Sequence, residues 1–471
     1  MRFRKWVPLI SAVFVMSCLT ACNNSGSPSS SATKIALSSN GVTVEGAAIS
    51  TDPDDPVYLS HDKMESGKQE PAEEGGESPS GGEQTEVSVV NITSPGTYRL
   101  FGTLEEGQIR VDLGEKAAKD PKAVVSLILD NAHIRCSAAP AIFFENVYEC
   151  DGGETPEQAS AEVDTSAAGA NIILADGSIN TVQGSQGAGA SEKAAVSSKM
   201  SLNINGENEN YGTLNLIGDE GICSDLHLTV NGGNIHISAG NNGIRAGNDY
   251  VSVTTVNGGN LRISAGLSED GWGIDSKGWL VMNGGTVVAA AHSSGVSGFR
   301  SDRGTYINGG TVVALGSAAE RLESTSGQVT MNLQFDAGNP LEGPIVVTDD
   351  EKNAVFAYDP DAGNVADSGF PSYSQALISC PALSEEALYH LYLGGTLEGT
   401  EEEGLYDIAT ITSYTGGKEQ SFTGTETGLN GVFETSDGSE KTVISSGAGP
   451  ERFTDFYLGS RVNFFFGVNG K

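Results

Sequence analysis

The chain has 471 residues, a formal net charge of −35 at pH 7, and 62 glycines against 16 prolines. Nucleic acid and anionic membrane surfaces are poor partners for so acidic a chain, because binding to phosphate needs clustered Lys and Arg. Abundant glycine and an aromatic content of 7% favour a fold of many tight turns over an α/β enzyme core.

The N-terminus predicts export with a lipid anchor. Residues 1–5 are basic and residues 6–19 are mostly apolar, a signal-peptide pattern that is too short for a stable membrane span. The sequence Leu-Thr-Ala-Cys at 19–22 resembles the bacterial lipobox. We therefore expect a signal peptide over 1–21, a lipid on Cys22 and a flexible tether over 22–33, so that lipid alone holds the exported protein at the outer face of the cell membrane or on the cell surface.

Composition divides the rest of the chain into four regions. Residues 34–50 predict initial strands, and residues 51–86 predict a disordered acidic insertion because they are rich in Pro, Glu, Gly and Ser. A repeat region is expected over 87–335. A β-rich C-terminal region that caps the open edge of the repeats is expected over 336–471.

The repeat region carries an Asn-Gly pair at a nearly constant interval. Consecutive pairs are 26, 26, 26 and 25 residues apart and begin at Asn205, Asn231, Asn257, Asn283 and Asn308. A period of this size is typical of a solenoid, in which each repeat buries its apolar side chains against its neighbours. Alternating apolar residues flank each pair, and a third strand is indicated by Val196, Ile222, Ile244, Ile274 and Phe299, each followed two residues later by a small residue.

These patterns predict an all-β fold built as a parallel β-helix, with three short strands in each rung of about 26 residues. The asparagines are expected to stack as a structural ladder of amides in the αL geometry of a tight turn, with glycine beside them, and not to bind ligands.

Four cysteines remain after the signal peptide and lipid site: Cys136, Cys150, Cys223 and Cys380. An exported protein can pair them in three ways or keep them as thiols, and their spacing fits no zinc motif. Cys223 follows the inward Ile222 and is therefore expected to face outward.

Several segments carry a resemblance to a known family. Residues 92–100 and 102–104, the strand at 125–130, the Gly-Ile repeats and residues 373–381 resemble the bacterial carbohydrate-binding-domain lipoprotein family, whose fold is like that of polysaccharide (pectate) lyases. The resemblance extends over roughly residues 34–471. It implies a right-handed parallel β-helix, binding to plant-type polysaccharide such as cellulose or polygalacturonate, and Ca²⁺ between rungs.

The family tends to carry Asp-Gly-Ile at the turn into the third strand, where stacked oxygens suit calcium. The matching positions here depart from that pattern, since Asn242 replaces one carboxylate and Ser297 another. A single ion between the rungs of Asp219 and Glu269 is therefore expected rather than a full series, with a solvated acidic turn as the alternative. The candidate metal residues are Asp219, Glu220, Asn242, Glu269, Asp270 and Asp275.

Binding a neutral glycan usually needs flat aromatic side chains with polar groups beside them on an exposed face. Trp272 lies in a turn insertion and Trp279 lies between inward positions, so both are expected to be at least partly exposed. With Arg245 and Arg300 they form the candidate sugar site. The alternative is that the two Trp side chains only cover the edge of a rung.

Catalysis is the second interpretation. A lyase of this fold needs a Lys or Arg base beside calcium, and Lys277, Arg245 and Arg300 are candidates; a hydrolase needs a carboxylate cluster. However, the outward column of residues 199, 225, 247, 277 and 302 alternates in charge, which is typical of salt bridges on a solvated face. We therefore expect a non-catalytic carbohydrate-binding protein, with a polysaccharide lyase or hydrolase and a structural or adhesive surface protein as alternatives.

Overall fold

The computed structural model describes an all-β protein. Helical structure in the described residues is limited to two 3-10 turns, η1 (Ala117–Lys119) and η3 (Ile408–Thr410). No helix in this part of the chain is long and apolar enough to cross a membrane. The predicted signal peptide, Cys22 and most of the tether lie outside the described residues, which are 32–38, 40–66, 83–151, 155–185, 194–208, 211–268, 270–292, 295–317, 326–334, 343–349, 351–362, 373, 375–384, 388–415, 418–423 and 457–459.

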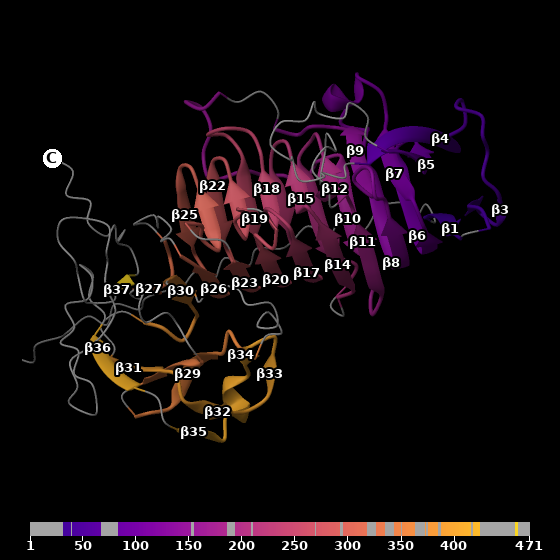
Figure 1. Cartoon of the computed structure of the whole chain (residues 1–471). Coiled ribbons are helices and arrows are strands. Elements are labelled where there is room, and N and C mark those ends of the chain that lie inside the picture. The colour runs from indigo at the N-terminus through magenta and orange to yellow at the C-terminus, as the bar shows by residue number, and fades with distance from the viewer. Residues whose placement is uncertain are drawn as a thin grey trace, which may run out of the picture. The chain divides into compact units, whose positions relative to one another are not determined.

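The repeats form three ladders in which each strand pairs in parallel with its counterpart one repeat later (Figure 1). The first ladder contains β10 (Ala170–Leu174), β13 (Leu202–Gly206), β16 (Leu228–Val230), β19 (Val253–Val256), β22 (Trp279–Met282) and β25 (Gly304–Ile307). The second contains β11 (Ile179–Gln183), β14 (Thr213–Gly218), β17 (Asn234–Ala239), β20 (Asn260–Ala265), β23 (Thr286–Ala291) and β26 (Thr311–Gly316). Earlier in the chain these two ladders are continuous. The long strand β8 (Val125–Arg135) pairs with both β10 and β11, and β6 (Gly96–Leu104) pairs along β8.

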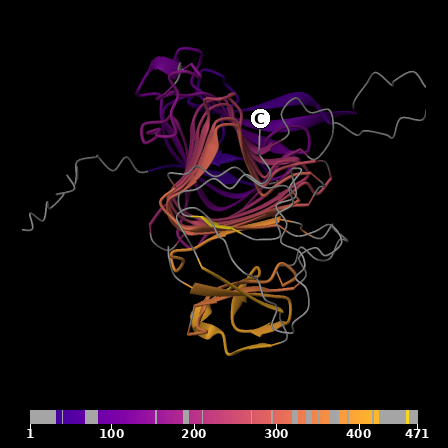
Figure 2. The same ribbon diagram turned by 90° about the vertical axis from the view of Figure 1, so that its left-hand side faces the viewer.

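The third ladder is a separate sheet, with nine strands among the described residues. It begins with β4 (Val57–Ser66), which runs antiparallel to β5 (Glu83–Ile92), and continues in parallel from β5 through β7 (Gly107–Asp112), β9 (Ile142–Asn146), β12 (Ala194–Ser198), β15 (Glu220–Ser224), β18 (Ile244–Ala246), β21 (Ile274–Ser276) and β24 (Phe299–Ser301). Figure 2 shows the strands of successive repeats one behind another. Three parallel strands per repeat, as predicted from the sequence, are confirmed.

The registers between strands explain the sequence period. Leu228 pairs with Leu202 on one side and with Thr254 on the other, so a step between rungs is one repeat of the Asn-Gly interval. Side chains that alternate inward from all three ladders, such as Leu228, Ile235 and Ile244, have no exposed surface. They belong to one apolar cluster that runs along the repeats, so the core is shared between neighbours and no repeat has a core of its own.

The asparagine column forms the predicted ladder. Asn257 donates from Nδ2 to Oδ1 of Asn231 over 2.8 Å and accepts from Asn283 over 2.9 Å, and Asn231 and Asn308 make the same contact with the preceding rung. The predicted αL geometry of the asparagines is wrong, because the left-handed residue is the second glycine after Asn231, Asn257, Asn283 and Asn308, with φ of 108° at Gly233 and 90° at Gly259. A Cβ at Gly259 would lie 2.7 Å from the carbonyl oxygen of Gly233, so rung spacing also excludes a side chain there.

The N-terminal region corrects one expectation. The initial strands are present as β1 (Thr33–Leu37), β2 (Thr43–Val44) and β3 (Ala47–Ala48), and β1 pairs in parallel with β6. The acidic insertion predicted over 51–86 is not disordered at 57–66 and 83–86, where β4 and the start of β5 form an antiparallel pair. Val57 and Leu59 alternate with polar residues at the start of this segment, and average composition hid that strand signal. The remainder of the predicted insertion, 67–82, lies outside the described residues.

Parallel stacking ends at β26, where the C-terminal region begins to pair with the repeats. β30 (Gln375–Ser379) runs antiparallel to β26 and to β27 (Thr330–Gln334), which also pairs with β37 (Tyr457–Gly459). The last edge of the second ladder is therefore covered by strand pairing, which protects its backbone groups. A strand-like run at 376–379 in the predicted β-rich region forms part of β30, and a second such run at 462–466 lies outside the described residues.

The C-terminal region also forms a second sheet. In the described residues this antiparallel sheet contains β33 (Glu401–Glu402), β34 (Leu405–Tyr406), β29 (Ala354–Tyr358), β28 (Ile345–Asp349), β31 (Leu388–Leu393) and β36 (Lys418–Thr423), in that order. A separate pair consists of β32 (Thr396–Glu398) and β35 (Ser413–Thr415). One face of the larger sheet shares an apolar cluster with outward side chains of β23 and β26, including Val288 and Leu315.

Candidate functional site

The third ladder carries a row of polar side chains on its outer face. Each inward residue, such as Ile274 or Phe299, is fully buried, and the next residue along the strand points outward. Registers place these outward residues at matching positions of successive strands. They are Ser197, Cys223, Arg245, Asp275 and Arg300, and we refer to this row together with Trp272 and Lys277 as the third-ladder face.

Asp275 lies at the centre of this face. Its side chain is 3% exposed and contacts two cations, with Nζ of Lys277 3.1 Å from Oδ2 and Nε of Arg300 3.6 Å from Oδ1. Arg245 lies opposite Asp275 on the neighbouring strand. Burial lowers the pKa of Arg245, but the charges of nearby carboxylates, Glu220 first among them, raise it by more. The cations of the face are therefore matched by carboxylates, and the network is charge-balanced.

Trp272 is the aromatic member of the third-ladder face. Its half-buried ring carries the Arg300 guanidinium, whose central carbon is 4.3 Å from the ring centroid. Arg300 is held in turn by Asp275 and by Asp302, whose Oδ1 is 3.6 Å from Nη2. The backbone N–H of Trp272 donates to Oδ1 of Asn242 over 3.0 Å. The backbone and the ring of Trp272 are thus both held in place. A ligand that stacks on the ring therefore costs less conformational entropy of this side chain.

Five of the six predicted metal residues lie in the described part of the chain, where Asn242 and Glu220 contact each other. There, no group of three or more His, Cys, Asp and Glu side chains is placed to hold a metal ion. The side-chain oxygen of Asn242 accepts from Trp272, and its Nδ2 donates to Glu220 over 3.0 Å. Asp275 contacts two cations, which is a poor environment for a calcium ligand. Asp219 is buried, Asp270 is exposed, and Glu269 lies outside the described residues.

Trp279 does not lie on the surface as expected. It points outward from β22 but is only 7% exposed, because it packs with Val253 and Val281 under a loop formed by residues 155–168, which we call the covering loop. Ala159, Ala161 and Val163 of that loop contact the cluster. The Arg303 guanidinium lies 4.2 Å from the Trp279 ring centroid and donates to the Pro156 carbonyl. A sugar cannot stack on a ring covered in this way, so the structure separates Trp279 from the rest of the candidate sugar site.

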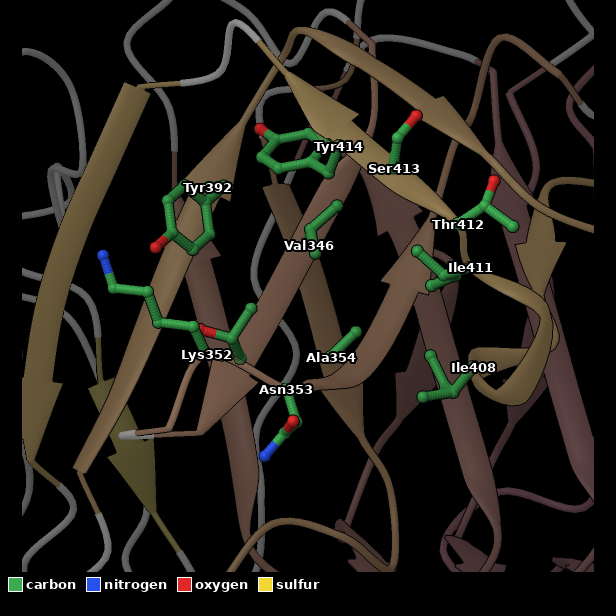
Figure 3. Close-up of a pocket in the computed structure, with 11 residues that line it drawn as sticks. Val346, Lys352, Asn353, Ala354, Tyr392, Ile408, Ile411, Thr412, Ser413 and Tyr414 are labelled. Atoms are coloured by element: carbon green, nitrogen blue, oxygen red, sulfur yellow. The ribbon is translucent and has the colours of Figure 1, made fainter.

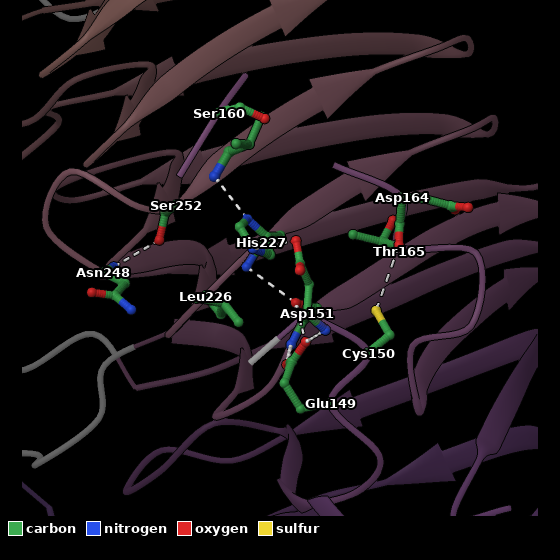
Figure 4. A network of polar contacts seen from close by, with 12 residues as sticks. Glu149, Cys150, Asp151, Ser160, Asp164, Thr165, Leu226, His227, Asn248 and Ser252 are labelled. Carbon is green, nitrogen blue, oxygen red and sulfur yellow. Dashed lines mark hydrogen bonds and ion pairs between the residues drawn. The ribbon is translucent and has the colours of Figure 1, made fainter. Parts of the chain in front are cut away.

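A polar network anchors the covering loop (Figure 4). Glu149 accepts hydrogen bonds from the backbone N–H and the hydroxyl of Ser201, at 2.6 and 2.9 Å. Nε2 of His227 lies 3.6 Å from Oδ2 of Asp151, and burial lowers the pKa of this imidazole to about 4. A neutral His227 fits its other contact, in which Nδ1 accepts from the backbone N–H of Val253 over 3.0 Å. The contact with Asp151 is therefore between a neutral ring and a carboxylate at neutral pH.

The same network contains Cys150, whose thiol does not have the character of a nucleophile. Its Sγ donates to the carbonyl of Asp164 over 3.7 Å, and burial raises its pKa to about 12. Nucleophilic thiols usually have a lowered pKa, so the raised pKa of Cys150 does not favour such a role for this thiol. Cys136, Cys150, Cys223 and Cys380 are all free thiols, and Cys223 lies half-buried on the third-ladder face as its position predicts.

Two contributors to these contacts were not predicted from the sequence. Lys277 was expected to act as a base or to pair with carboxylates of neighbouring rungs, yet it pairs with Asp275, two residues before it in the same rung. Two residues apart on a strand, these side chains point the same way, and that spacing could have indicated the pair. Arg303 closes the covering loop over Trp279 from 147 residues away, a contact that no local signal reveals.

Comparisons with known proteins address the family and not the site. No curated protein is significantly similar to this chain. Among solved structures, a polysaccharide lyase-like protein from C. thermocellum, determined as a gadolinium derivative, is 22% identical. That likeness covers 59% of this chain and 92% of the other, with a TM-score of 0.37, which is too low to carry an argument. The carbohydrate-binding domain-containing protein family matches residues 86–151 and 154–353, more than half of the sequence. The chain therefore belongs to the carbohydrate-binding domain-containing protein family.

Proposed function

We propose that this protein binds polysaccharide on the third-ladder face of a right-handed parallel β-helix, with Trp272 as the platform on which a sugar ring stacks. The observation that carries the proposal is the half-buried indole of Trp272, held by the backbone contact to Asn242 and by the Arg300 stack. Rigid aromatic side chains with polar groups beside them are the usual means of binding a sugar, because the C–H face of the ring packs on the aromatic face while hydroxyls bond at the edge. Membership of a carbohydrate-binding family supports the same ligand class.

The charge balance of the face indicates how the glycan is held. Arg245, Lys277 and Arg300 all lie close to carboxylates, so they offer hydrogen-bond donors without a strong net positive field. We expect stacking and hydrogen bonds to dominate the affinity, and neutral chains of the cellulose type to bind at least as well as polygalacturonate. Binding by a mainly neutral mode should change little between low and physiological ionic strength, because salt screens only exposed charges strongly.

The proposal has two further parts, a lipid anchor on Cys22 and calcium-assisted binding, and each is tested separately. The lipobox-like sequence supports a lipid on Cys22 and a place on the outer side of the cell membrane. Labelling with a radioactive fatty acid should mark the wild-type chain and not a Cys22→Ala variant. Calcium assistance is tested by repeating glycan binding with a chelator: lost binding would support a bound ion, and unchanged binding would remove it from the proposal.

A glycan array with purified mature protein tests the main proposal. We expect Trp272→Ala to lose about 2 kcal/mol of binding free energy, roughly thirtyfold in affinity, as for a central aromatic contact. Phe101, which is 36% exposed on β6, provides a matched control: Phe101→Ala also removes an exposed ring but should bind as the wild type does. An array without any bound glycan would refute the proposed function.

The enzyme interpretation stays as the second candidate because Lys277 and Arg300 flank a buried carboxylate on the same face. A lyase would produce unsaturated uronate absorbance from polygalacturonate with calcium, and a hydrolase would release reducing ends. Binding without either signal favours the non-catalytic protein. Neither binding nor turnover would leave a structural or adhesive surface protein.

A further inference from the structure

We propose that the C-terminal sheet carries a second sugar site, which takes a short neutral oligosaccharide. A cavity of about 660 Å³ lies on this sheet, within the size range of small-molecule sites of roughly 300–1,000 Å³. The site goes beyond the proposed function, because it is remote in sequence from the third-ladder face. Most of its lining follows residue 353, where the family match ends.

The cavity exists because the two faces of the sheet have different environments. On β28, Ile345 and Val347 are fully buried in the apolar cluster shared with the repeats, whereas Val346 and Thr348 alternate to the opposite face and line the cavity. The chain at 408–414, which includes η3 and part of β35, lines the other side. The cavity is thus a space between a sheet face and a connecting segment (Figure 3).

Two tyrosines supply the aromatic wall that a sugar needs. Tyr392 lies opposite Val346 in the sheet, and its ring centroid is 5.4 Å from that of Tyr414 at an interplanar angle of 70°. Both rings line the cavity, and Figure 3 shows them near each other. The Tyr414 hydroxyl donates to the carbonyl of Gly394 over 2.7 Å, which fixes the position of its ring.

Thr348 supplies an observation that points to a missing partner. It is 7% exposed, and its buried Oγ1 makes no hydrogen bond within the described residues. A buried hydroxyl without a partner is costly, and native proteins usually satisfy it with protein, water or ligand. Because Thr348 lines the cavity, a hydroxyl of a bound sugar is well placed to provide the absent bond.

The remaining lining indicates a ligand without charge. It contains one cation, Lys352 at the rim, and no carboxylate, although the chain as a whole has 61 Asp and Glu. Asn353 adds an amide, and Thr412 and Ser413 add hydroxyls beside the apolar Ile408 and Ile411. Aromatic and aliphatic surfaces mixed with neutral donors and acceptors suit a pyranose ring better than a phosphate or a purely apolar molecule.

Titration calorimetry on the mature protein, with neutral tetrasaccharides of β-1,4-linked glucose, mannose and xylose as probes, tests the site. We expect at least one probe to bind, and Tyr414→Ala to weaken that binding tenfold or more. Tyr414→Phe, which keeps the ring, should bind within threefold of the wild type. Thr348→Val should weaken binding severalfold while leaving the melting temperature unchanged or higher, because it removes a hydroxyl that lacks a partner. A purely structural Thr348 would not give this combination.

Trp272→Ala separates this site from the proposed function. If the C-terminal site exists, this variant retains the binding that Tyr414→Ala loses, even if the third-ladder face binds nothing. The proposal is overturned if none of the three probes binds, or if Tyr414→Ala and Thr348→Val both bind as tightly as the wild type. It is also overturned if Trp272→Ala alone abolishes all binding.

Discussion

Trp279→Ala tests whether the Trp279 side chain stabilises the fold and takes no part in ligand binding. The ring is 7% exposed and packs between the outward residues of the first ladder and the covering loop. An aromatic side chain buries about 150–250 Å², and at about 25 cal/mol per Å² its transfer from water is worth roughly 4–6 kcal/mol, an upper estimate. Large-to-Ala changes of aromatic core residues cost about 3–5 kcal/mol in practice, and we expect a value in that range.

The loss should be local before it is global, because Trp279 lies outside the core shared by the repeats. It belongs to a separate cluster with Val253 and Val281, whereas Leu280 and Met282 of the same strand point into the main core. The covering loop is held further by Arg303 and by Thr165, whose hydroxyl donates to Oδ1 of Asn203 over 2.8 Å. Removing the ring should therefore free the loop first, as in other repeat proteins whose parts open separately.

Hydrogen exchange and chemical denaturation measure the two parts of this prediction. In Trp279→Ala, amides of residues 155–168 should exchange faster, and the urea midpoint should fall. Trp272→Ala, by contrast, should leave both measurements closer to those of the wild type, because its ring is only partly buried and belongs to neither the main core nor the cluster under the covering loop. The reasoning is refuted if Trp279→Ala keeps wild-type exchange in the covering loop, or if it weakens glycan binding as strongly as Trp272→Ala does.

Two further predictions concern stability. Asn257→Ala removes two amide contacts of the ladder, so the free energy of unfolding should fall by about 1–2 kcal/mol. Asn205 makes one such contact in the described residues, so Asn205→Ala should cost less. Equal losses of the two variants in urea denaturation would contradict this prediction. Burial lowers the pKa of His227 and His292 to about 4, so the unfolded chain binds more protons between about pH 4 and 6.5. Stability should be complete above pH 6.5 and fall towards pH 4, by up to roughly 3 kcal/mol for each histidine. His227→Asn, which keeps an acceptor for Val253, should flatten that pH dependence, and an unchanged profile would contradict the assignment.

The structure of the repeats could be predicted because the same sequence pattern recurs in every rung. Asn257 could be assigned to a ladder from its spacing alone, and the registers place its amide beside those of Asn231 and Asn283. Inward and outward positions followed from the two-residue alternation, which correctly turned Ile222 inwards and Cys223 outwards. Because each repeat of the sequence forms the same three strands, the repeat length and the positions of the apolar residues are enough to predict the strands and the directions of their side chains.

The failures lie where the chain departs from the repeat. Trp279 was correctly predicted to point outward. The covering loop, however, is not part of the repeat pattern, so nothing in the sequence indicated that this loop folds back over the Trp279 ring. The antiparallel pair of β4 and β5 was missed because it opens a segment dominated by Pro, Glu and Gly. The tyrosine pair of the C-terminal cavity brings together residues 22 positions apart on two sheets, which a periodic pattern cannot reveal.

Glycan binding by Trp272→Ala, measured beside the wild type and Phe101→Ala, shows whether polysaccharide binds to the third-ladder face. Each purified mature protein would be titrated against the glycan that the wild type binds best on the array. We expect a roughly thirtyfold loss of affinity for Trp272→Ala, with an unchanged melting temperature, and wild-type binding by Phe101→Ala. Wild-type affinity in a correctly folded Trp272→Ala protein would contradict it, because the third-ladder face would then not be where the polysaccharide binds.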